Sequence, residues 1–557
     1  MTAYEDFLRA KVRLAEPKGF EVKPSAFHPL LKPHQRAIAT WLVRQGRAAC
    51  FAAFGLGKSV MQLEVVRVTR DLAGGYALIT IPLGVRQEFY RDAAMLGITV
   101  RFIRSFDEVD DPNTIYLTNY ETVRDGKLDP RRFSVASLDE ASCLRGFGGS
   151  KTFREFMALF AGDDRAAGIR GDGVRYRYVA TATPSPNEYI ELLAYSAFLG
   201  VMDVGQAKTR FFKRNSEKAD QLTIHAHKEG EFWMWVASWA IFVQRPSDLG
   251  FSDEGYALPE LDIRWHEVPS DHSHAGHERN GQGRLLRNTA IGVQDAAAEK
   301  RESLPARIAK LMEIRAEAPD AHRIIWHDLE AERHAIEAAV PTAVSVYGSQ
   351  DLEERERAIV QFSDGEFQEL AAKPVIAGSG CNFQRHCSWA IYLGIGFKFN
   401  DFIQSIHRLH RFLQTGRVRI DLIYTEAERD IRRQLERKWQ QHNTMVQRMT
   451  EIIKQYGLSI AAMAQTLTRS MGVERIEIKG KDYTIVNNDT VLETRRMENN
   501  SVGLTITSIP FSTQYEYSPN YADFGHTDDN AHFFQQMDYL IPEMLRVTIP
   551  GRLACIH

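Results

Sequence analysis

A glycine-rich turn in the N-terminal part of the chain has residues that could hold the phosphates of a nucleotide. The sequence FAAFGLGKSV (51–60) places Gly55, Gly57, Lys58 and Ser59 between an apolar run and a helical pattern. Glycines let the backbone wrap around phosphates, and the amides that open the helix point at negative charge. Lys58 would reach the β- and γ-phosphates, and the Ser59 hydroxyl would ligate magnesium. The alternative interpretation is a plain strand–helix turn.

A pair of acidic residues could complete a hydrolytic site. In SLDEAS (137–142), Asp139 and Glu140 follow the buried-strand pattern FSVASL and therefore emerge at the end of a strand. Asp139 would hold magnesium through water, and Glu140 would orient or deprotonate an attacking water. An acidic pair alone is usually solvated surface. Together with the glycine-rich turn it predicts a nucleotide hydrolase.

The elements that must position these residues form two regions in which short β-rich runs alternate with helical patterns. This alternation predicts an α/β fold with parallel sheets covered by helices on both faces. The β-rich runs of the first region are RAACFAAF (47–54), YALITIPL (76–83), TIYLTNY (114–120), FSVASLDEA (133–141) and YRYVATATP (176–184). Those of the second are RIIWHDL (323–329), AVSVYG (343–348), PVIAGSG (374–380), WAIYLGI (389–395) and RIDLIYT (419–425).

The remaining segments have other patterns. FWMWVASWAIFV (232–243) predicts a buried helix, and 426–470 predicts one or two long helices. From about residue 473 the pattern returns to strands, in RIEIKG, DYTIVNN and VGLTITSIP. The expected domains are a first lobe at 1–204 with an N-terminal extension, an irregular and helical connector at 205–300, a second lobe at 301–445, a helical linker at 446–472 and a C-terminal segment at 473–557.

Composition excludes several classes of protein. The chain has 557 residues with 69 Lys and Arg against 72 Asp and Glu, an ordinary globular balance in which any basic surface must be local. The longest apolar run is too short to span a bilayer, and the N-terminus has no secretory pattern. Five scattered cysteines without a CxxC pair favour a reducing cytoplasm. His272, His274 and His277 predict a polar loop more readily than a metal site.

With the phosphate turn and acidic pair placed, the chain over about 30–445 resembles helicase superfamily 2, and within it the Swi/Snf-like DNA translocases. The resemblance implies two RecA-like lobes that sandwich ATP. The segments that carry it are LKPHQ (31–35), ITIPLGVRQEF (79–89), TNYETVR (118–124), LDEASCLRGFGGSK (138–151), TATPSPN (181–187), a connector at 243–268, RIIWHDLEAE (323–332), VYGSQDLEERERAIVQF (346–362), AGSGCNFQ (377–384) and QSIHRLHR (404–411).

The resemblance assigns roles to individual residues. Gln35 would read adenine, and Arg408 and Arg411 would reach across from the second lobe, where a guanidinium stabilises charge on the γ-phosphate. The implied ATP-binding residues are Gln35, Gly55, Gly57, Lys58, Ser59, Gly380 and Gln404, with Ser59 and Asp139 at magnesium. The implied catalytic residues are Lys58, Asp139, Glu140, Arg408 and Arg411, and the candidate DNA contacts are Arg86, Asn119, Tyr120, Thr183 and Ser379.

The C-terminal segment, about 473–557, resembles the opening of a DNA N4-cytosine/N6-adenine methyltransferase, a partial Rossmann-like unit. Asn488-Asp489 and Ser508-Ile509-Pro510-Phe511 stand at the family's motif positions. The resemblance implies that Ser508 and Pro510 hold an exocyclic amine while Phe511 stacks on a flipped-out base. The family's glycine-rich cofactor motif does not follow. We therefore expect S-adenosylmethionine to bind only if a further C-terminal portion is supplied, and no methyl transfer by this chain alone.

The sequence thus predicts a magnesium- and ATP-dependent motor on double-stranded DNA, cytoplasmic in a bacterium or phage-encoded, and linked to a DNA modification or restriction system. Methyltransferase or restriction subunits are its expected partners, and a membrane is not. Two alternatives stay open. One is a strand-separating DNA or RNA helicase, and the other is a component of a methylation or restriction complex in which ATP serves only as a switch.

Overall fold

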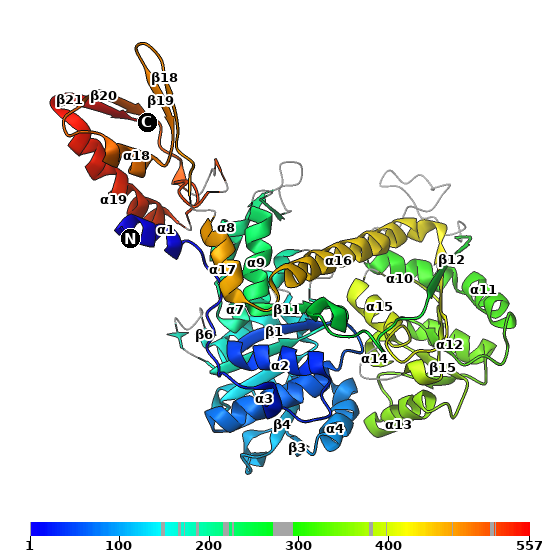
Figure 1. Ribbon diagram of the computed structural model, residues 1–557. Helices are drawn as coiled ribbons and strands as arrows, with labels where there is room; N and C mark the ends of the chain where they lie inside the picture. Colours follow the sequence, from blue (N-terminus) through cyan, green and yellow to red (C-terminus); the bar gives the residue numbers. More distant parts are fainter. Residues whose placement is uncertain are drawn as a thin grey trace. The chain divides into compact units, whose positions relative to one another are not determined.

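The computed structural model (Figure 1) describes residues 2–145, 151–164, 169–171, 173–184, 189–214, 222–225, 228–270, 293–377, 383–396, 398–469, 472–512, 517–518, 520–527 and 529–557. The contacts divide the chain into two compact units. The larger unit comprises 18–191 and 241–450, and the smaller comprises 1–17, 192–240 and 451–557. The histidine-rich loop at 269–283 lies mostly outside the described residues.

Lobe 1 of the larger unit is built on a seven-stranded sheet in the order β11-β1-β8-β5-β2-β4-β3. From β1 to β3 every neighbouring pair is parallel. The strands are β1 (Arg47–Ala52), β2 (Ala77–Ile81), β3 (Val100–Phe102), β4 (Ile115–Asn119), β5 (Val135–Asp139), β8 (Tyr176–Ala180) and β11 (Ala240–Val243). Strands β2 and β5 are buried along their full length, as expected for a parallel sheet covered on both faces.

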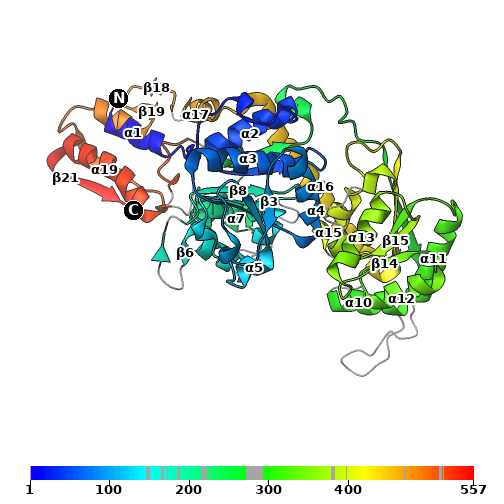
Figure 2. The same ribbon diagram turned by 90° about the horizontal axis from the view of Figure 1, so that it is seen from below.

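Helices connect the strands of lobe 1 and cover its sheet. They are α2 (Pro33–Gln45), α3 (Lys58–Ala73), α4 (Arg86–Met95), α5 (Tyr120–Arg124) and α6 (Lys151–Phe156). Helix α3 lies beside α2 and α4 (Figure 1 and Figure 2), and it contacts β2, β4, β5 and β8. Because the strands are parallel, their carboxyl ends meet at one edge of the sheet. This edge receives the phosphate turn after β1 and the acidic pair at the end of β5.

Lobe 2 has a six-stranded, wholly parallel sheet in the order β12-β17-β16-β13-β15-β14. Its strands are β12 (Leu261–Val268), β13 (Arg323–Trp326), β14 (Val344–Val346), β15 (Glu369–Ala372), β16 (Trp389–Tyr392) and β17 (Val418–Thr425). Its helices are α10 (Val293–Glu302), α11 (Leu304–Ala316), α12 (Glu330–Ala339), α13 (Leu352–Ser363), α14 (Pro374–Ala377), α15 (Phe399–Ile406) and α16 (Arg429–Tyr456). The predicted α/β class with two parallel-sheet lobes is confirmed.

Two sequence predictions about single elements were wrong. The segment 374–380 was expected as a strand, but Pro374–Ala377 is the short helix α14 and the strand is β15 just before it. Proline has no N–H for a central strand and suits the first turn of a helix, which explains the shift. The segment 232–243 was expected as one helix. It is α9 (Glu229–Trp239) followed by β11, whose AIFV sequence favours a strand.

The smaller unit joins the two ends of the chain. Helix α1 (Ala3–Ala10) packs on α19 (Asn530–Val547), and both share a core with Val491 of α18 (Thr490–Arg496) (Figure 1). The Tyr4 hydroxyl donates to Asp489, 2.8 Å away, and buried Lys11 donates to the Gln536 side chain at 2.6 Å. The unit also contains α7 (Leu192–Leu199), α8 (Val204–Phe211), α9, α17 (Ile460–Arg469) and the hairpin β9 (Phe212–Arg214) and β10 (Leu222–Ile224).

The C-terminal segment contains a parallel βαβ unit. Strand β20 (Val502–Thr507) pairs in parallel with β21 (Thr548–Ile556), and α19 lies between them in sequence. An antiparallel hairpin, β18 (Ile476–Lys479) and β19 (Thr484–Asn487), precedes it. The partial Rossmann-like methyltransferase segment stays a prediction. No helix in the described part of the chain is both long and apolar enough to cross a membrane.

Candidate nucleotide-binding site

The glycine-rich turn lies between β1 and α3, where Gly55 has φ +85° and Gly57 has φ +79°. Side chains would not fit at either position. A Cβ on Gly57 would lie 2.5 Å from Nε2 of Gln35, and one on Gly55 would lie 2.9 Å from the Phe412 ring. The turn therefore needs glycine both for its left-handed backbone and for the close approach of its neighbours.

Lys58, the first residue of α3, is a partly buried cation without an ion-pair partner in the described part of the chain. Its Nζ donates to the carbonyl of Ala52 at 3.1 Å and lies 5.2 Å from the centre of the Phe54 ring. Burial lowers the pKa of Lys58, although Glu140 and Asp139 act in the opposite direction. A partly buried charge without an ion-pair partner is costly, so this site fits an anionic group such as a phosphate.

Asp139 ends β5 and is 6% exposed, and one of its two carboxylate oxygens is hydrogen-bonded. Its Oδ1 accepts from Nε2 of Gln62 at 2.7 Å, and Oε1 of Gln62 accepts from the Ser137 hydroxyl at 2.9 Å. The second carboxylate oxygen of Asp139 has no hydrogen bond among the described residues. Burial, with the neighbouring Glu140, raises the pKa of Asp139 to about 7. A carboxylate with an open oxygen and a disfavoured negative charge fits a divalent cation.

Glu140 receives hydrogen bonds from both lobes. Its Oε2 accepts from the Thr181 hydroxyl, which follows β8, at 3.0 Å, and from Nε2 of Gln404, in α15 of lobe 2, at 3.2 Å. Glu140 has φ +47°, a conformation that is rare for a residue with a side chain and concentrates at functional sites. A second bond between the lobes lies beside it, because the Thr183 hydroxyl donates to Oδ1 of Asn400 at 2.5 Å.

The arginines of lobe 2 lie close to the same region. Arg408 is 5% exposed. Desolvation of the partly buried Arg411 guanidinium lowers its pKa to about 10, although Glu88 of α4 opposes this shift. Its Nε is buried and has no hydrogen-bond partner among the described residues. Like Lys58, Arg411 is thus a partly buried positive charge available to an anion.

Gln35 contacts the phosphate turn itself. Its Nε2 donates to the carbonyl of Leu56 at 2.9 Å, and its Oε1 accepts from the backbone N–H of Lys32 at 2.8 Å. One amide hydrogen and one lone pair of this side chain are therefore left for a ligand. That capacity is compatible with the adenine-reading role, which stays a prediction.

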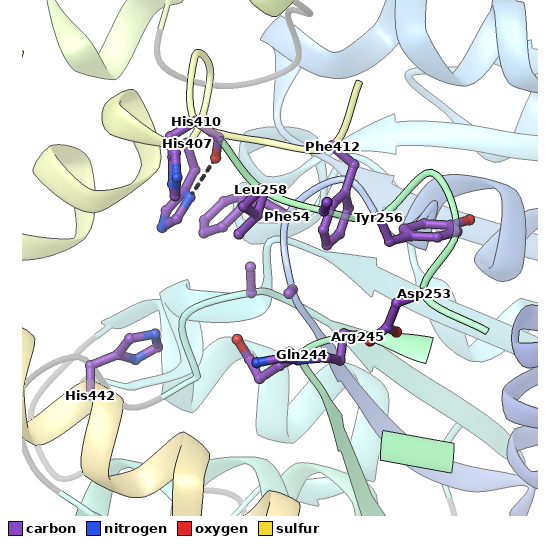
Figure 3. Close-up of a pocket in the computed structure, with 13 residues that line it drawn as sticks. Phe54, Gln244, Arg245, Asp253, Tyr256, Leu258, His407, His410, Phe412 and His442 are labelled. Atoms are coloured by element: carbon purple, nitrogen blue, oxygen red, sulfur yellow. Dashed lines mark hydrogen bonds between the residues drawn. The ribbon is translucent and has the colours of Figure 1, made fainter. Parts of the chain in front are cut away.

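A cavity of about 530 Å³ lies beside the turn, between lobe 1, the connector and lobe 2 (Figure 3). Phe54 and His407 stack with ring centres 4.3 Å apart, and Tyr256 meets Phe412 edge-on at 4.9 Å. His442 faces the cavity from α16. Burial lowers the pKa of His407 to about 3 and that of His442 to about 4, so both rings are neutral at pH 7. Such aromatic walls suit a planar ligand.

Sequence reasoning missed Asp92 of α4. The Ser59 hydroxyl donates to Oδ2 of Asp92 at 2.5 Å. Burial raises the pKa of Asp92 to about 6, and the bond from Ser59 opposes that shift. No motif identified Asp92, because it lies 33 residues after Ser59 in an ordinary helical pattern. Only the packing of α4 on α3 brings the two together.

Four candidate DNA contacts end or follow strands of lobe 1 at the carboxyl edge of its sheet, but they already have protein partners. Arg86 forms an ion pair with Glu356 of α13 in lobe 2, with N–O distances of 3.2 and 3.4 Å. Asn119 caps α5, and the Tyr120 hydroxyl donates to the carbonyl of Asp139. Thr183 bonds Asn400, as described above. Ser379, together with the predicted ATP ligand Gly380, lies outside the described residues.

The methyltransferase-like residues follow β20 in the smaller unit. Ser508 lies 3.5 Å from Nδ1 of His557, Pro510 follows it by two residues, and Phe511 is 52% exposed. Asp489 caps α18 by accepting from the backbone N–H of Val491, and it also accepts from Tyr4. Its carboxylate therefore already has a structural role in this unit.

Comparisons with known proteins find a likeness among solved structures. No protein-family model matches the sequence, and no curated protein is significantly similar to it. Among solved structures, the SWI2/SNF2 ATPase core of Sulfolobus solfataricus, determined in complex with double-stranded DNA, resembles this chain at 18% identity. The match covers 73% of this chain and 90% of that one, with a TM-score of 0.36. At this level the likeness carries no functional information, so the function has to be inferred from the site.

Proposed function

We propose that the chain is a DNA-dependent ATPase of the helicase superfamily 2 type, which couples hydrolysis of magnesium-ATP to movement along double-stranded DNA. The observation that supports this most is the position of Glu140. This carboxylate stands beside the phosphate turn of lobe 1 and accepts hydrogen bonds from Thr181 of lobe 1 and Gln404 of lobe 2. A catalytic group bonded from both lobes can link a chemical step to their relative motion.

Each residue of the site has a distinct task in this proposal. Lys58 and the amides at the start of α3 would neutralise the phosphates, because the lysine is a partly buried cation and the helix N-terminus favours negative charge. Ser59 and Asp139 would hold magnesium, which when bound neutralises charge between the β- and γ-phosphates. Glu140 orients the attacking water and accepts its proton. Arg411, with Arg408, stabilises the charge on the transferred phosphoryl group from the side of lobe 2.

The bonds between the lobes provide the coupling. Glu140 can keep the bond from Gln404 only while lobe 2 stays close, and the Thr183–Asn400 bond has the same requirement. When hydrolysis changes the hydrogen bonds and charge around Glu140, both contacts are disturbed. Opening and closing of the lobes would follow the nucleotide cycle. This arrangement favours a motor over a protein in which ATP is only a switch.

The choice of DNA rests on the sequence motifs at the carboxyl edge of lobe 1, among them the segments around Arg86 and Asn119. Binding there would be directed to the phosphate backbone and sensitive to salt. The first experiment is ATP hydrolysis with no nucleic acid, single-stranded DNA, duplex DNA and RNA. We expect strong stimulation by the duplex, and its loss in Lys58→Ala. Stimulation by RNA alone would contradict the proposal, and so would turnover that no nucleic acid changes.

We also propose that the C-terminal segment links the motor to a DNA-modification system. The parallel β20–α19–β21 unit, with Ser508 and Phe511 after its first strand, supports this proposal. The expected result is that the 557-residue chain transfers no methyl group from labelled S-adenosylmethionine to DNA. Incorporation of label by this chain alone, removed by Ser508→Ala, would overturn the expectation that a further portion is needed.

A further inference from the structure

Ser59 has an acidic partner that the nucleotide-site motifs do not include. Its hydroxyl donates to Oδ2 of Asp92 over 2.5 Å. Asp92 lies in the last part of α4, and its side chain is 14% exposed. The nearest cation recorded for it is the adjacent Arg91, with Nε 3.9 Å from Oδ1. The carboxylate is therefore placed against α3 mainly through the serine hydroxyl.

Asp139 does not take this role in the chain. Its Oδ1 accepts from Nε2 of Gln62, and Gln62 is itself held by the Ser137 hydroxyl. A serine hydroxyl has one hydrogen and two lone pairs. With the hydrogen of Ser59 directed to Asp92, both lone pairs remain available on the oxygen. Asp92 thus accepts the hydroxyl hydrogen of Ser59, whereas Asp139 keeps one carboxylate oxygen open for a cation.

We propose that Asp92 is a positioning residue for magnesium, acting through Ser59. The proposal rests on the proposed nucleotide site. A hydrogen bond to a carboxylate fixes the rotamer of the serine, so that a lone pair faces the cation. It also increases the electron density on the oxygen, as outer carboxylates do for other metal ligands. Asp92 itself need not touch magnesium.

The test measures binding of a fluorescent ADP analogue at increasing Mg²⁺ concentrations, and once in EDTA. Loss of an outer carboxylate typically weakens metal affinity about 10- to 100-fold, so Asp92→Ala should raise the Mg²⁺ concentration for half-maximal binding by this factor. Affinity in EDTA should not change. Asp92→Asn, which is nearly the same shape, should give a smaller shift because its amide oxygen accepts the bond without charge.

A double-mutant comparison separates this role from a structural one. If Asp92 acts through Ser59, Asp92→Ala should add less than about twofold in a Ser59→Ala background. Asp71→Asn is the control, because Asp71 is a partly exposed carboxylate of α3 that bonds arginines. It should leave the Mg²⁺ requirement unchanged. Circular dichroism of each variant would check that it is folded.

Two results would overturn the proposal. One is an unchanged Mg²⁺ requirement in both Asp92 variants while ADP still binds. The other is an Asp92→Ala shift in the Mg²⁺ requirement that is as large in the Ser59→Ala background as in the wild type. The readout is binding and uses no DNA. A wild-type protein that binds magnesium-ADP but shows no DNA-stimulated hydrolysis would therefore contradict the motor proposal, while the role of Asp92 would still be decided by the binding measurements.

Discussion

Replacing Arg411 should stabilise the resting protein and abolish its activity. The fall in the pKa of Arg411 to about 10 corresponds to a cost of about 3 kcal/mol for holding its charge in a partly desolvated site. This cost applies in full at pH 7, because the guanidinium stays protonated there. Arg411→Met removes the charge and keeps an apolar side chain of adaptable shape. We expect the nucleotide-free variant to gain about 1–3 kcal/mol.

Thermal unfolding without nucleotide should reveal this gain as a rise of about 1–4 °C, because the unit that contains Arg411 has about 380 residues and its unfolding temperature shifts by only about 1 °C per kcal/mol. Adding magnesium and a non-hydrolysable ATP analogue should then stabilise the wild type more than the variant, because the variant lacks the Arg411 guanidinium that would contact the γ-phosphate. Hydrolysis with duplex DNA should fall about 10³- to 10⁵-fold.

Two controls define the interpretation. Arg411→Lys keeps a charge but not the planar fork, so it should lose hydrolysis without the gain in stability. Arg417→Met removes an exposed arginine of the same lobe that is paired with Glu260, and should not stabilise the protein. If Arg411→Met lowers the unfolding temperature of the nucleotide-free protein, Arg411 is satisfied at rest, and the argument from its unpaired charge is wrong.

Three further predictions address the link between the lobes, magnesium and DNA. Gln404→Ala removes the hydrogen bond to the charged Glu140 carboxylate, which contributes about 1.5–3 kcal/mol, so DNA-stimulated hydrolysis should fall at least about tenfold while ADP binding changes little. An unchanged rate would show that Gln404 does not couple the lobes. Because Asp139 has a raised pKa of about 7 and magnesium needs its ionised form, the Mg²⁺ concentration required for ADP binding should fall about tenfold per pH unit up to pH 7 and level off above it. The same group makes the metal-free protein less stable as pH rises from about 4 to 7. An Mg²⁺ requirement independent of pH would contradict the assignment of Asp139 to magnesium. Glu356→Gln releases Arg86 and should strengthen DNA binding. The gain should be no more than about fivefold, because the ion pair is partly exposed, and it should be smaller at high salt. Weaker binding in a filter assay would show that Glu356 supports the DNA site.

Much of the local structure could be predicted from the sequence. The β1–turn–α3 unit follows from an apolar run, two glycines and a helical pattern, and all of these signals lie within about 25 residues. Strands β5 and β13 were equally clear, because strands buried on both faces leave continuous apolar runs. The error at 374–380 has a local cause too, since the apolar run there begins with a proline that suits a helix start.

The partners of the site residues could not be predicted. Asp92 reaches Ser59, and Glu356 reaches Arg86, only through packing between elements distant in sequence. The same holds for helix α1, whose Tyr4 donates to Asp489 from the other end of the chain. Motifs identify residues that touch a ligand, whereas residues that orient them have no fixed spacing and common side chains.

The most direct test of the account is displacement of a third strand from duplex DNA. A triplex-forming oligonucleotide is bound near one end of a duplex, and its release is followed after addition of protein and magnesium-ATP. Movement along the duplex predicts ATP-dependent release of the third strand, none with Lys58→Ala, and no separation of the two duplex strands. Hydrolysis without release, or release only with separation of the duplex, would contradict a double-stranded DNA translocase.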